Sequence, residues 1–515
     1  MVASGDLRLR IDSTLSALRS GGMSNYLSIL DQLSCLLFIK RLDENHPTDS
    51  SGARANPVFP AGLDGTGSDG LPYSELRWSA FAALEPDQAY AIVDRHVFPF
   101  LRGLGATYPP AEIMRDARLV IPTPALLHEA IQLVEGIAAE PDAFEYLLDR
   151  PPASAGSTQP VVPRHIAELV VALAAPTAAD TIADPAVGTA GLLATAADYL
   201  RGAHPEDLAI DSARRRFESD TFTGFAADAA LARIASVNLQ LHSVENPDIG
   251  RLGDPEDVDT ARYSLVLSIL PFGGSLDRAS ALTSQVHTKK AELVSAALSL
   301  RLLADGGQAA VIVPGSLLIG ASKAHKALRR MLVEDSRLDA VIRLPRGAFK
   351  PQSGASSAIL LFSKAAGTDK VWFYDVRADG YSLDSRRVPL LPPEGLGAWG
   401  VPSQDSGGEP AADEHSRNDL PDVLARWAAV RTGRDDASGN EAAEQPRSAQ
   451  CFFVPKAEIV AHDYDLSFDR YKQIEHGETA NRAPEEILAE LTALDAEIAH
   501  ATRALAEVLK VDSSR

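Results

Sequence analysis

The stretch TIADPAVGTAGLL, residues 181–193, decides the fold of this chain. A short apolar run ends at Asp184, a turn with two glycines follows, and an apolar helical pattern begins after Gly191. A glycine-rich turn between a strand and a helix lets the main chain approach a ligand where a side chain would clash. The stretch therefore predicts the first strand, turn and helix of an α/β fold, with a binding site at the turn. The alternative is a turn that keeps its glycines only for packing.

Outward from this turn, residues 160–390 alternate short β-branched runs with helical patterns such as RHIAELVVALA. The runs that we expect to be buried strands are TIADP (181–185), YSLVLSI (263–269), QAAVIVP (308–314), LDAVIRLP (338–345) and SAILLFSK (357–364). Alternation of this kind predicts a parallel sheet flanked by helices.

Four regions are predicted along the 515 residues. Residues 1–150 are expected to be helical, because leucines recur every three or four positions in SNYLSILDQLSCLLFIKRLDE (24–44). Residues 151–395 carry the α/β pattern. Residues 396–447 are rich in Gly, Asp, Glu, Ser and Pro, which indicates a mobile linker or insert with a helical island. Residues 448–515 form a C-terminal region.

The C-terminal region ends in a heptad pattern that follows Pro484. Its apolar positions are spaced alternately by four and three: Ile487, Leu491, Leu494, Ile498, Ala501, Leu505 and Val508. Such a pattern predicts a coiled-coil helix. The helix either packs on its own domain or meets a helix of a partner subunit, and we favour the partner because the pattern is regular and lies at a chain end.

Composition restricts the function classes. The net charge of −21 argues against a chain that grips DNA alone, since phosphate binding needs clustered Lys and Arg. The sequence has no run of about 18 apolar residues, so we expect no membrane span. The first residues also carry no apolar secretory segment. Cys35 and Cys451 lie too far apart for a metal or redox motif. We expect a cytoplasmic protein in which these are ordinary thiols and His165 and His242 are structural or solvated.

Several motifs, in order, are similar to those of one family. They are YLSILDQLSCLLFIKRLDE, PRHIAELVVALAAP, DPAVGTAGLL, LLADGGQAAVIVPGSLL, LDAVIRLPRGAF, SGASSAILLFSK, WFYDVRADGYSLDSRR, NDLPDVLARW and DYDLSFDRYK. Together, across about 450 residues, they resemble the modification (methyltransferase) subunit of type I restriction–modification systems. The resemblance implies a Rossmann-like class I methyltransferase domain that uses S-adenosylmethionine, with an N-terminal helical domain and a C-terminal helical tail. It also implies DNA contact through a specificity-type subunit, with a second methyltransferase subunit and a restriction subunit as further partners.

The resemblance also implies a set of cofactor-binding residues. They are Arg164, Asp184, Gly188, Thr189, Gly191 and Asp254. The family pattern DPACGTGG is changed here, since Val187 replaces a cysteine and Ala190 replaces a glycine. At the position of the acidic residue that holds the ribose hydroxyls stands Ala226, and Asp228 is expected to cap the next helix instead. The family's FYTPR reads PVVPR here, which removes a hydroxyl next to Arg164.

The family's catalytic tetrapeptide NPPF corresponds to Ile269, Leu270, Pro271 and Phe272. Adenine N6 is a poor nucleophile, and the family accepts its N–H bonds on the Asn oxygen and the next carbonyl while the aromatic ring stacks on the flipped base. Ile269 carries no acceptor, and Leu270 replaces the proline that shapes the turn. Both the cofactor site and the base site therefore depart from the pattern.

Three functions follow from these departures. The favoured one is a catalytically impaired pseudo-methyltransferase that serves as a structural or regulatory subunit of a DNA-modification or phage-defence complex. The second is a working adenine-N6 DNA methyltransferase with a non-standard pocket. The third is a cofactor or nucleotide sensor without chemistry, suggested by Gly188, Gly191 and Asp254.

Overall fold

The computed structural model describes residues 5–47, 58–59, 70–105, 108–139, 142–148, 160–251, 260–275, 288–365, 367–391, 417–432 and 445–473. The described elements up to Tyr471 belong to one compact unit. The predicted heptad helix (487–508) and Asp254 lie outside the described residues. In the described part, no helix has the length and apolar character needed to cross a bilayer.

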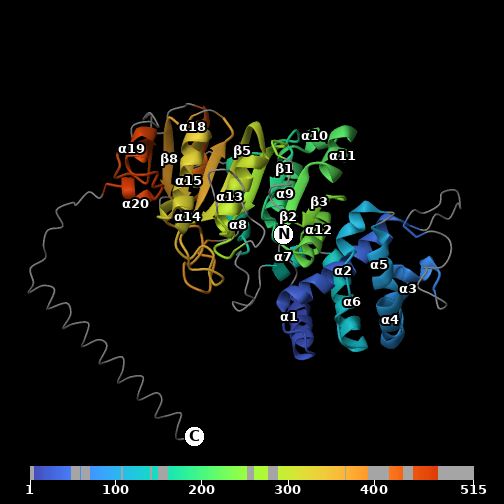
Figure 1. Cartoon of the computed structure of the whole chain (residues 1–515). Coiled ribbons are helices and arrows are strands. Elements are labelled where there is room, and N and C mark those ends of the chain that lie inside the picture. The colour runs from blue at the N-terminus through green and yellow to red at the C-terminus, as the bar shows by residue number, and fades with distance from the viewer. Residues whose placement is uncertain are drawn as a thin grey trace, which may run out of the picture. The chain divides into compact units, whose positions relative to one another are not determined.

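The N-terminal region is helical, as predicted (Figure 1). Its α-helices are α1 (Gly5–Ser20), α2 (Tyr26–Asn45), α3 (Trp78–Phe81), α4 (Pro86–Ile92), α5 (Phe98–Leu104), α6 (Pro124–Ala139) and α7 (Asp142–Leu148). Helix α2 begins where the Asn25 side chain accepts the backbone N–H of Leu27 at 2.9 Å, an ordinary N-cap. The leucines that predicted this helix are buried in the core of the helical region, apart from Leu27, which is partly buried and packs against it.

The described strands of the α/β region form a nine-stranded sheet in the order β3-β2-β1-β4-β5-β7-β6-β8-β9. The strands are β1 (Ile182–Asp184), β2 (Phe222–Ala226), β3 (Asp248–Arg251), β4 (Tyr263–Ile269), β5 (Leu303–Pro314), β6 (Arg337–Arg343), β7 (Ser357–Ser363), β8 (Lys370–Asp375) and β9 (Cys451–Pro455). All five predicted runs are strands. Strands β3, β2, β1, β4 and β5 are parallel, whereas β7 is antiparallel to both β5 and β6, and β9 to β8. The wholly parallel sheet predicted from the sequence is therefore wrong for β7, which enters between β5 and β6.

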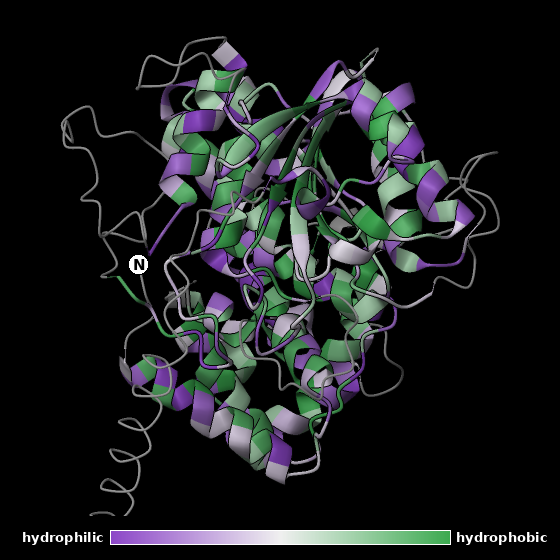
Figure 2. Ribbon diagram, turned by 90° about the vertical axis from the view of Figure 1, so that its left-hand side faces the viewer, coloured by the Kyte–Doolittle hydropathy of each residue, from purple (hydrophilic) through white to green (hydrophobic). Residues whose placement is uncertain are grey.

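Helices cover both faces of the sheet (Figure 1). They are α8 (Arg164–Ala174), α9 (Gly191–Ala203), α10 (Pro205–Leu208), α11 (Asp211–Ser219), α12 (Ala229–Leu241), α13 (Ala291–Leu302), α14 (Gly315–Ile319), α15 (Lys323–Arg330), α18 (Leu420–Thr432), α19 (Lys456–Ala461) and α20 (Phe468–Tyr471). Strand β4 alternates its side chains between two apolar cores, with Leu265 and Leu267 on one face and Val266 on the other. Coloured by hydropathy, the strands at the centre of the molecule are mostly apolar (Figure 2).

Two segments that the sequence placed outside the α/β region contribute to it. Within the predicted mobile insert, α18 packs against the sheet domain, and the Trp427 indole N–H donates to the carbonyl of Leu173 at 3.0 Å. Strand β9 completes the edge of the sheet beside β8. Buried aromatic side chains hold these late elements in place, and Trp427 packs on Trp372 with ring centroids 5.7 Å apart.

The helical region packs on the sheet domain through α2 and α12. The buried Arg233 guanidinium donates to both carboxylate oxygens of Asp31, at 2.6 and 3.1 Å, and to the carbonyl of Ile113 at 3.2 Å. Ile234 and Val237 of α12 join the apolar core of the helical region. This contact fixes α12, whose other end reaches the turn that follows β1.

Candidate functional site

The two sequence motifs meet at one edge of the sheet. Strands β1 and β4 are parallel neighbours, with Ile182 opposite Leu265 and Ala183 opposite Val266. The turn after β1 and the peptide after β4 therefore leave the sheet side by side, at its carboxyl edge. Because β2 and β4 lie on opposite sides of β1, this is also the point where the strand order reverses, the usual ligand position in such sheets.

The turn after β1 keeps a left-handed backbone that suits ligand binding, at a cost in conformational energy at Ala190. Gly188 has φ of +51° and Ala190 has φ of +64° and ψ of 23°, so both adopt the left-handed conformation. The family glycine replaced by Ala190 is thus one that the backbone requires, and alanine in this conformation costs about 1 kcal/mol. A Cβ built on Gly191 would meet no described atom within 4 Å, so the main chain there faces open space.

Asp184 faces the neighbouring strand. Its Oδ1 accepts the Ser268 hydroxyl at 2.6 Å and the backbone N–H of Ala186 at 2.9 Å. Both side chains are buried, Ser268 completely. Burial raises the pKa of Asp184 to about 7, against the lowering by these two hydrogen bonds. Asp184 therefore connects the turn to β4 directly before Ile269.

Neither the position of the ribose-binding acid nor Arg164 directs a polar side chain to the cofactor. Ala226 is fully buried at the end of β2. Asp228 accepts the N–H of Leu231 at 2.9 Å and caps α12, as predicted. The Arg164 side chain makes ion pairs with Glu145 at 2.9 Å and Glu168 at 3.0 Å. The structure thus places Arg164 at the start of α8 but directs it to these carboxylates.

One residue of the turn is held by a side chain that the sequence reading missed. The Asn238 amide of α12 donates to the carbonyl of Thr189 at 2.8 Å. Asn238 is buried between Val237 and Leu239 in α12, and a buried amide in a largely apolar helix was the available signal. Through it, α12 fixes the middle of the turn.

The described residues fit only part of S-adenosylmethionine. The left-handed turn and the open direction at Gly191 suit the approach of a ligand to the main chain. A carboxylate for the ribose hydroxyls is missing among the described residues of the β2 end, since Ala226 is apolar and Asp228 is a cap. The cofactor would supply the methyl group.

The peptide after β4 is built into the core. Ile269 is 5% exposed and Leu270 is fully buried, and the two side chains join the apolar cores on opposite faces of the sheet. The Leu270 N–H donates to the carbonyl of Ile312 in β5 at 2.9 Å. Phe272 is half-buried and meets Phe349 edge to face, with ring centroids 5.4 Å apart. The aromatic part of the motif is present, whereas the side chain at the acceptor position is a packed hydrocarbon.

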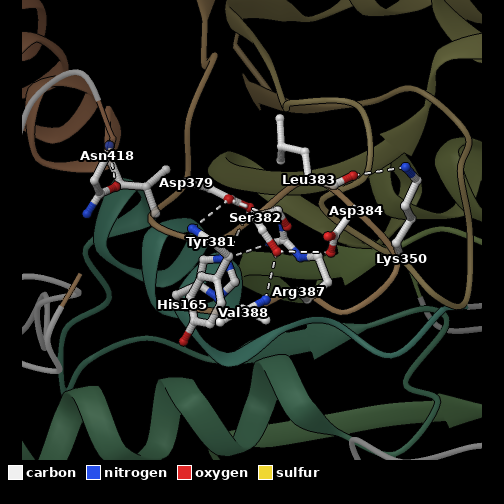
Figure 3. A network of polar contacts seen from close by, with 11 residues as sticks. His165, Lys350, Asp379, Tyr381, Ser382, Leu383, Asp384, Arg387, Val388 and Asn418 are labelled. Atoms are coloured by element: carbon white, nitrogen blue, oxygen red, sulfur yellow. Dashed lines mark hydrogen bonds and ion pairs between the residues drawn. The ribbon is translucent and has the colours of Figure 1, made fainter. Parts of the chain in front are cut away.

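A polar network fixes the loop after β8 near the same edge (Figure 3). The fully buried Asp379 carboxylate accepts two hydrogen bonds from Arg387, at 3.2 and 2.5 Å, and lies 3.2 Å from His165 Nε2. The His165 ring stacks on Tyr381, with centroids 4.4 Å apart. Lys350 donates to the Leu383 carbonyl at 2.9 Å. His165 is the second residue of α8, so this network ties the loop to the start of that helix and gives His165 the structural place that was predicted.

Sequence comparison finds relatives of this chain among DNA methylases. Residues 139–394 match the N-6 DNA methylase family. The chain is 24% identical over 520 residues to the EcoEI type I restriction enzyme methylase subunit of Escherichia coli, covering 95% of each protein. It is 27% identical over 364 residues to the EcoKI methylase subunit of Escherichia coli strain K12, covering 62% of this chain and 68% of that protein.

Two solved structures have the same fold. One, from a study of complex assembly and conformational transition of a type I restriction–modification system, is 25% identical, covers 99% of both chains and has a TM-score of 0.68. The type I methyltransferase subunit from Streptococcus thermophilus is 16% identical, covers 92% of this chain and 100% of that chain, and has a TM-score of 0.60.

Proposed function

Because residues 139–394 belong to the N-6 DNA methylase family, we propose that this chain is a methylase-type subunit of a type I restriction–modification complex whose own methyl transfer is impaired. The likeness to the EcoEI methylase subunit extends over 95% of both proteins, which supports the subunit type. In this role the fold serves as a structural or regulatory subunit in DNA modification and phage defence.

The observation that carries the impairment is the packing of Ile269. An adenine amino group that attacks a methyl donor develops positive charge, and a preorganised acceptor commonly contributes about 10²–10³ in rate. Ile269 offers only hydrocarbon at that position, and the side chain, 5% exposed, packs into the apolar core of one face of the sheet, where a water would find few polar partners. Ala226 stands where the family has the carboxylate that holds the ribose hydroxyls. Loss of that carboxylate weakens cofactor binding by about 1–3 kcal/mol.

The partners follow from charge and from the family. A chain with a net charge of −21 needs help to hold DNA, and a specificity-type subunit would supply it. The heptad residues Ile487–Val508 are the proposed docking helix for that subunit. A second methyltransferase subunit and a restriction subunit complete the proposed complex.

The deciding experiment restores the acceptor. Ile269→Asn should raise adenine methylation by at least about 10²-fold when the chain is co-expressed with its specificity-type subunit. We test the single substitution before adding Leu270→Pro, because proline would remove the N–H that pairs with Ile312. Ile269→Val is the matched control and should stay inactive. Methylation by the unaltered chain would overturn the proposed impairment.

A second function is favoured by a specific observation. The main chain at Gly191 faces open space and Phe272 keeps its place, which suits a working adenine-N6 methyltransferase or a sensor that binds cofactor without chemistry. Calorimetric titration with S-adenosylmethionine separates these functions from a scaffold. Binding at about 10 μM, near −7 kcal/mol, would favour an enzyme or a sensor, and no heat at millimolar ligand would leave the scaffold role.

A further inference from the structure

Three side chains from separate helices converge next to Arg164, the first residue of α8. Glu145 comes from α7 of the helical region, Asp198 from α9 and His242 from the end of α12. One ligand-type atom of each residue lies within 4.8 Å of those of the other two. The His242 side chain is 6% exposed, while Glu145 and Asp198 are 24% and 32% exposed and so remain accessible to water.

The two nitrogens of His242 face two carboxylates. Nδ1 lies 2.9 Å from Asp198 Oδ1 and forms a hydrogen bond, so it carries the proton in the neutral ring. Nε2 is buried and has no hydrogen-bond partner among the described residues, and it lies 3.4 Å from Glu145 Oε1. In the neutral ring the lone pair of Nε2 therefore lies close to a carboxylate oxygen. A cation between the two atoms would turn this repulsion into attraction.

The separation suits a metal ion. A tetrahedral ion with bonds of about 2.0–2.2 Å holds two ligand atoms about 3.4 Å apart, which is longer than a hydrogen bond. A histidine that donates from Nδ1 to a carboxylate while Nε2 binds the metal is a recurring arrangement in zinc proteins. Arg164 pairs with the other oxygen of Glu145, Oε2, at 2.9 Å and so holds Oε1 toward His242.

We propose that His242 Nε2 and Glu145 Oε1 bind a divalent transition-metal ion of the zinc class, with Asp198 holding the imidazole and water completing the coordination. The ion joins α7 to the end of α12, and so stabilises the contact between the helical region and the sheet domain. This role is independent of methyl transfer. Zinc is preferred over magnesium because imidazole suits zinc, whereas magnesium selects oxygen ligands.

The test uses the full-length, untagged chain after treatment with a chelator. Titration with ZnCl₂ should give saturable binding of one equivalent and a higher Tm, and MgCl₂ should give neither. His242→Gln and Glu145→Gln should each abolish this binding, and Asp198→Asn should weaken it about 10–100-fold. His204→Gln is the control, since His204 forms a similar pair with Asp207 at 3.3 Å outside the site, and it should bind like the unaltered chain.

Two outcomes would overturn the proposal. One is the absence of saturable zinc binding to the unaltered chain, and the other is unchanged binding in Glu145→Gln. The second variant decides the matter even where the buried His242 cannot be replaced without misfolding, because the Glu145 side chain is partly exposed. Neither outcome bears on the proposed impairment of methyl transfer, which is tested at Ile269.

Discussion

Replacing Asp184 by Asn should remove one specific part of the pH dependence of stability. The pKa of this carboxyl rises from its ordinary value of 3.8 to about 7, because the group is completely buried. In an unfolded chain the group loses its proton near pH 4, whereas in the folded chain it keeps the proton until about pH 7. The folded state therefore binds more protons in this window, and stability falls as pH rises through it. The contribution is fully present below about pH 4 and is lost above about pH 7.

The magnitude follows from the pKa difference. A shift of roughly 3 pH units, at about 1.4 kcal/mol each, gives about 4 kcal/mol between pH 4 and pH 7 as an upper value. Asn keeps an oxygen that accepts from Ser268 and Ala186 but does not ionise. The free energy of unfolding in urea, measured at several pH values, should therefore fall more steeply for the unaltered chain than for Asp184→Asn. Asp305→Asn, at a side chain that is 96% exposed, should leave the pH dependence unchanged. A constant difference between the unaltered chain and Asp184→Asn across the window would refute the reasoning.

Three further substitutions test the packing around the site. Ala190→Gly should leave stability within about 1 kcal/mol, because relief of the left-handed conformation offsets the lost methyl burial; thermal unfolding checks this, and a large loss would contradict the conformation. Arg233→Met should destabilise by up to about 3 kcal/mol by leaving Asp31, whose side chain is only 15% exposed, without its partner, and adding Asp31→Leu should recover most of that loss in urea unfolding. Asp379→Asn should loosen the loop after β8 and speed tryptic cleavage after the exposed Arg386; an unchanged cleavage rate would show that the network does not hold the loop.

The sequence predicts the positions of the strands better than their directions. Each expected strand is a run of buried apolar residues, and burial on both faces is a property of the run itself. The direction of β7 depends on the connection after β6, and the residues of β7 carry no sign of it. The same reasoning explains α18 and β9, whose place in the α/β region depends on distant partners such as Leu173 and Val371.

The candidate site shows the same limit at the level of single residues. The motifs that contain Gly188, Ala190 and Ile269 lie at one edge of the sheet, because neighbouring parallel strands bring their ends together. It did not reveal that Arg164 turns to Glu145 or that Asn238 holds the turn, since both depend on helices packed from elsewhere. The cluster of Glu145, Asp198 and His242 was equally hidden, because its members are 53 and 44 residues apart in the chain.

The two altered polar positions share a physical consequence. Ile269 and Ala226 stand at the carboxyl ends of β4 and β2, the two parallel strands that flank β1, where a methylase needs an acceptor and a carboxylate, and both are buried and apolar. A buried polar group at either end costs stability unless a ligand satisfies it, so functional sites are locally unfavourable for folding. Under the proposed function these positions are free to pack, and hydrocarbon is the more stable choice. Restoring Asn at position 269 should therefore lower stability by about 1–3 kcal/mol while it raises methylation. Lower stability together with higher methylation in Ile269→Asn would indicate a site that no longer performs chemistry. A site that uses a different acceptor would not gain methylation from this substitution.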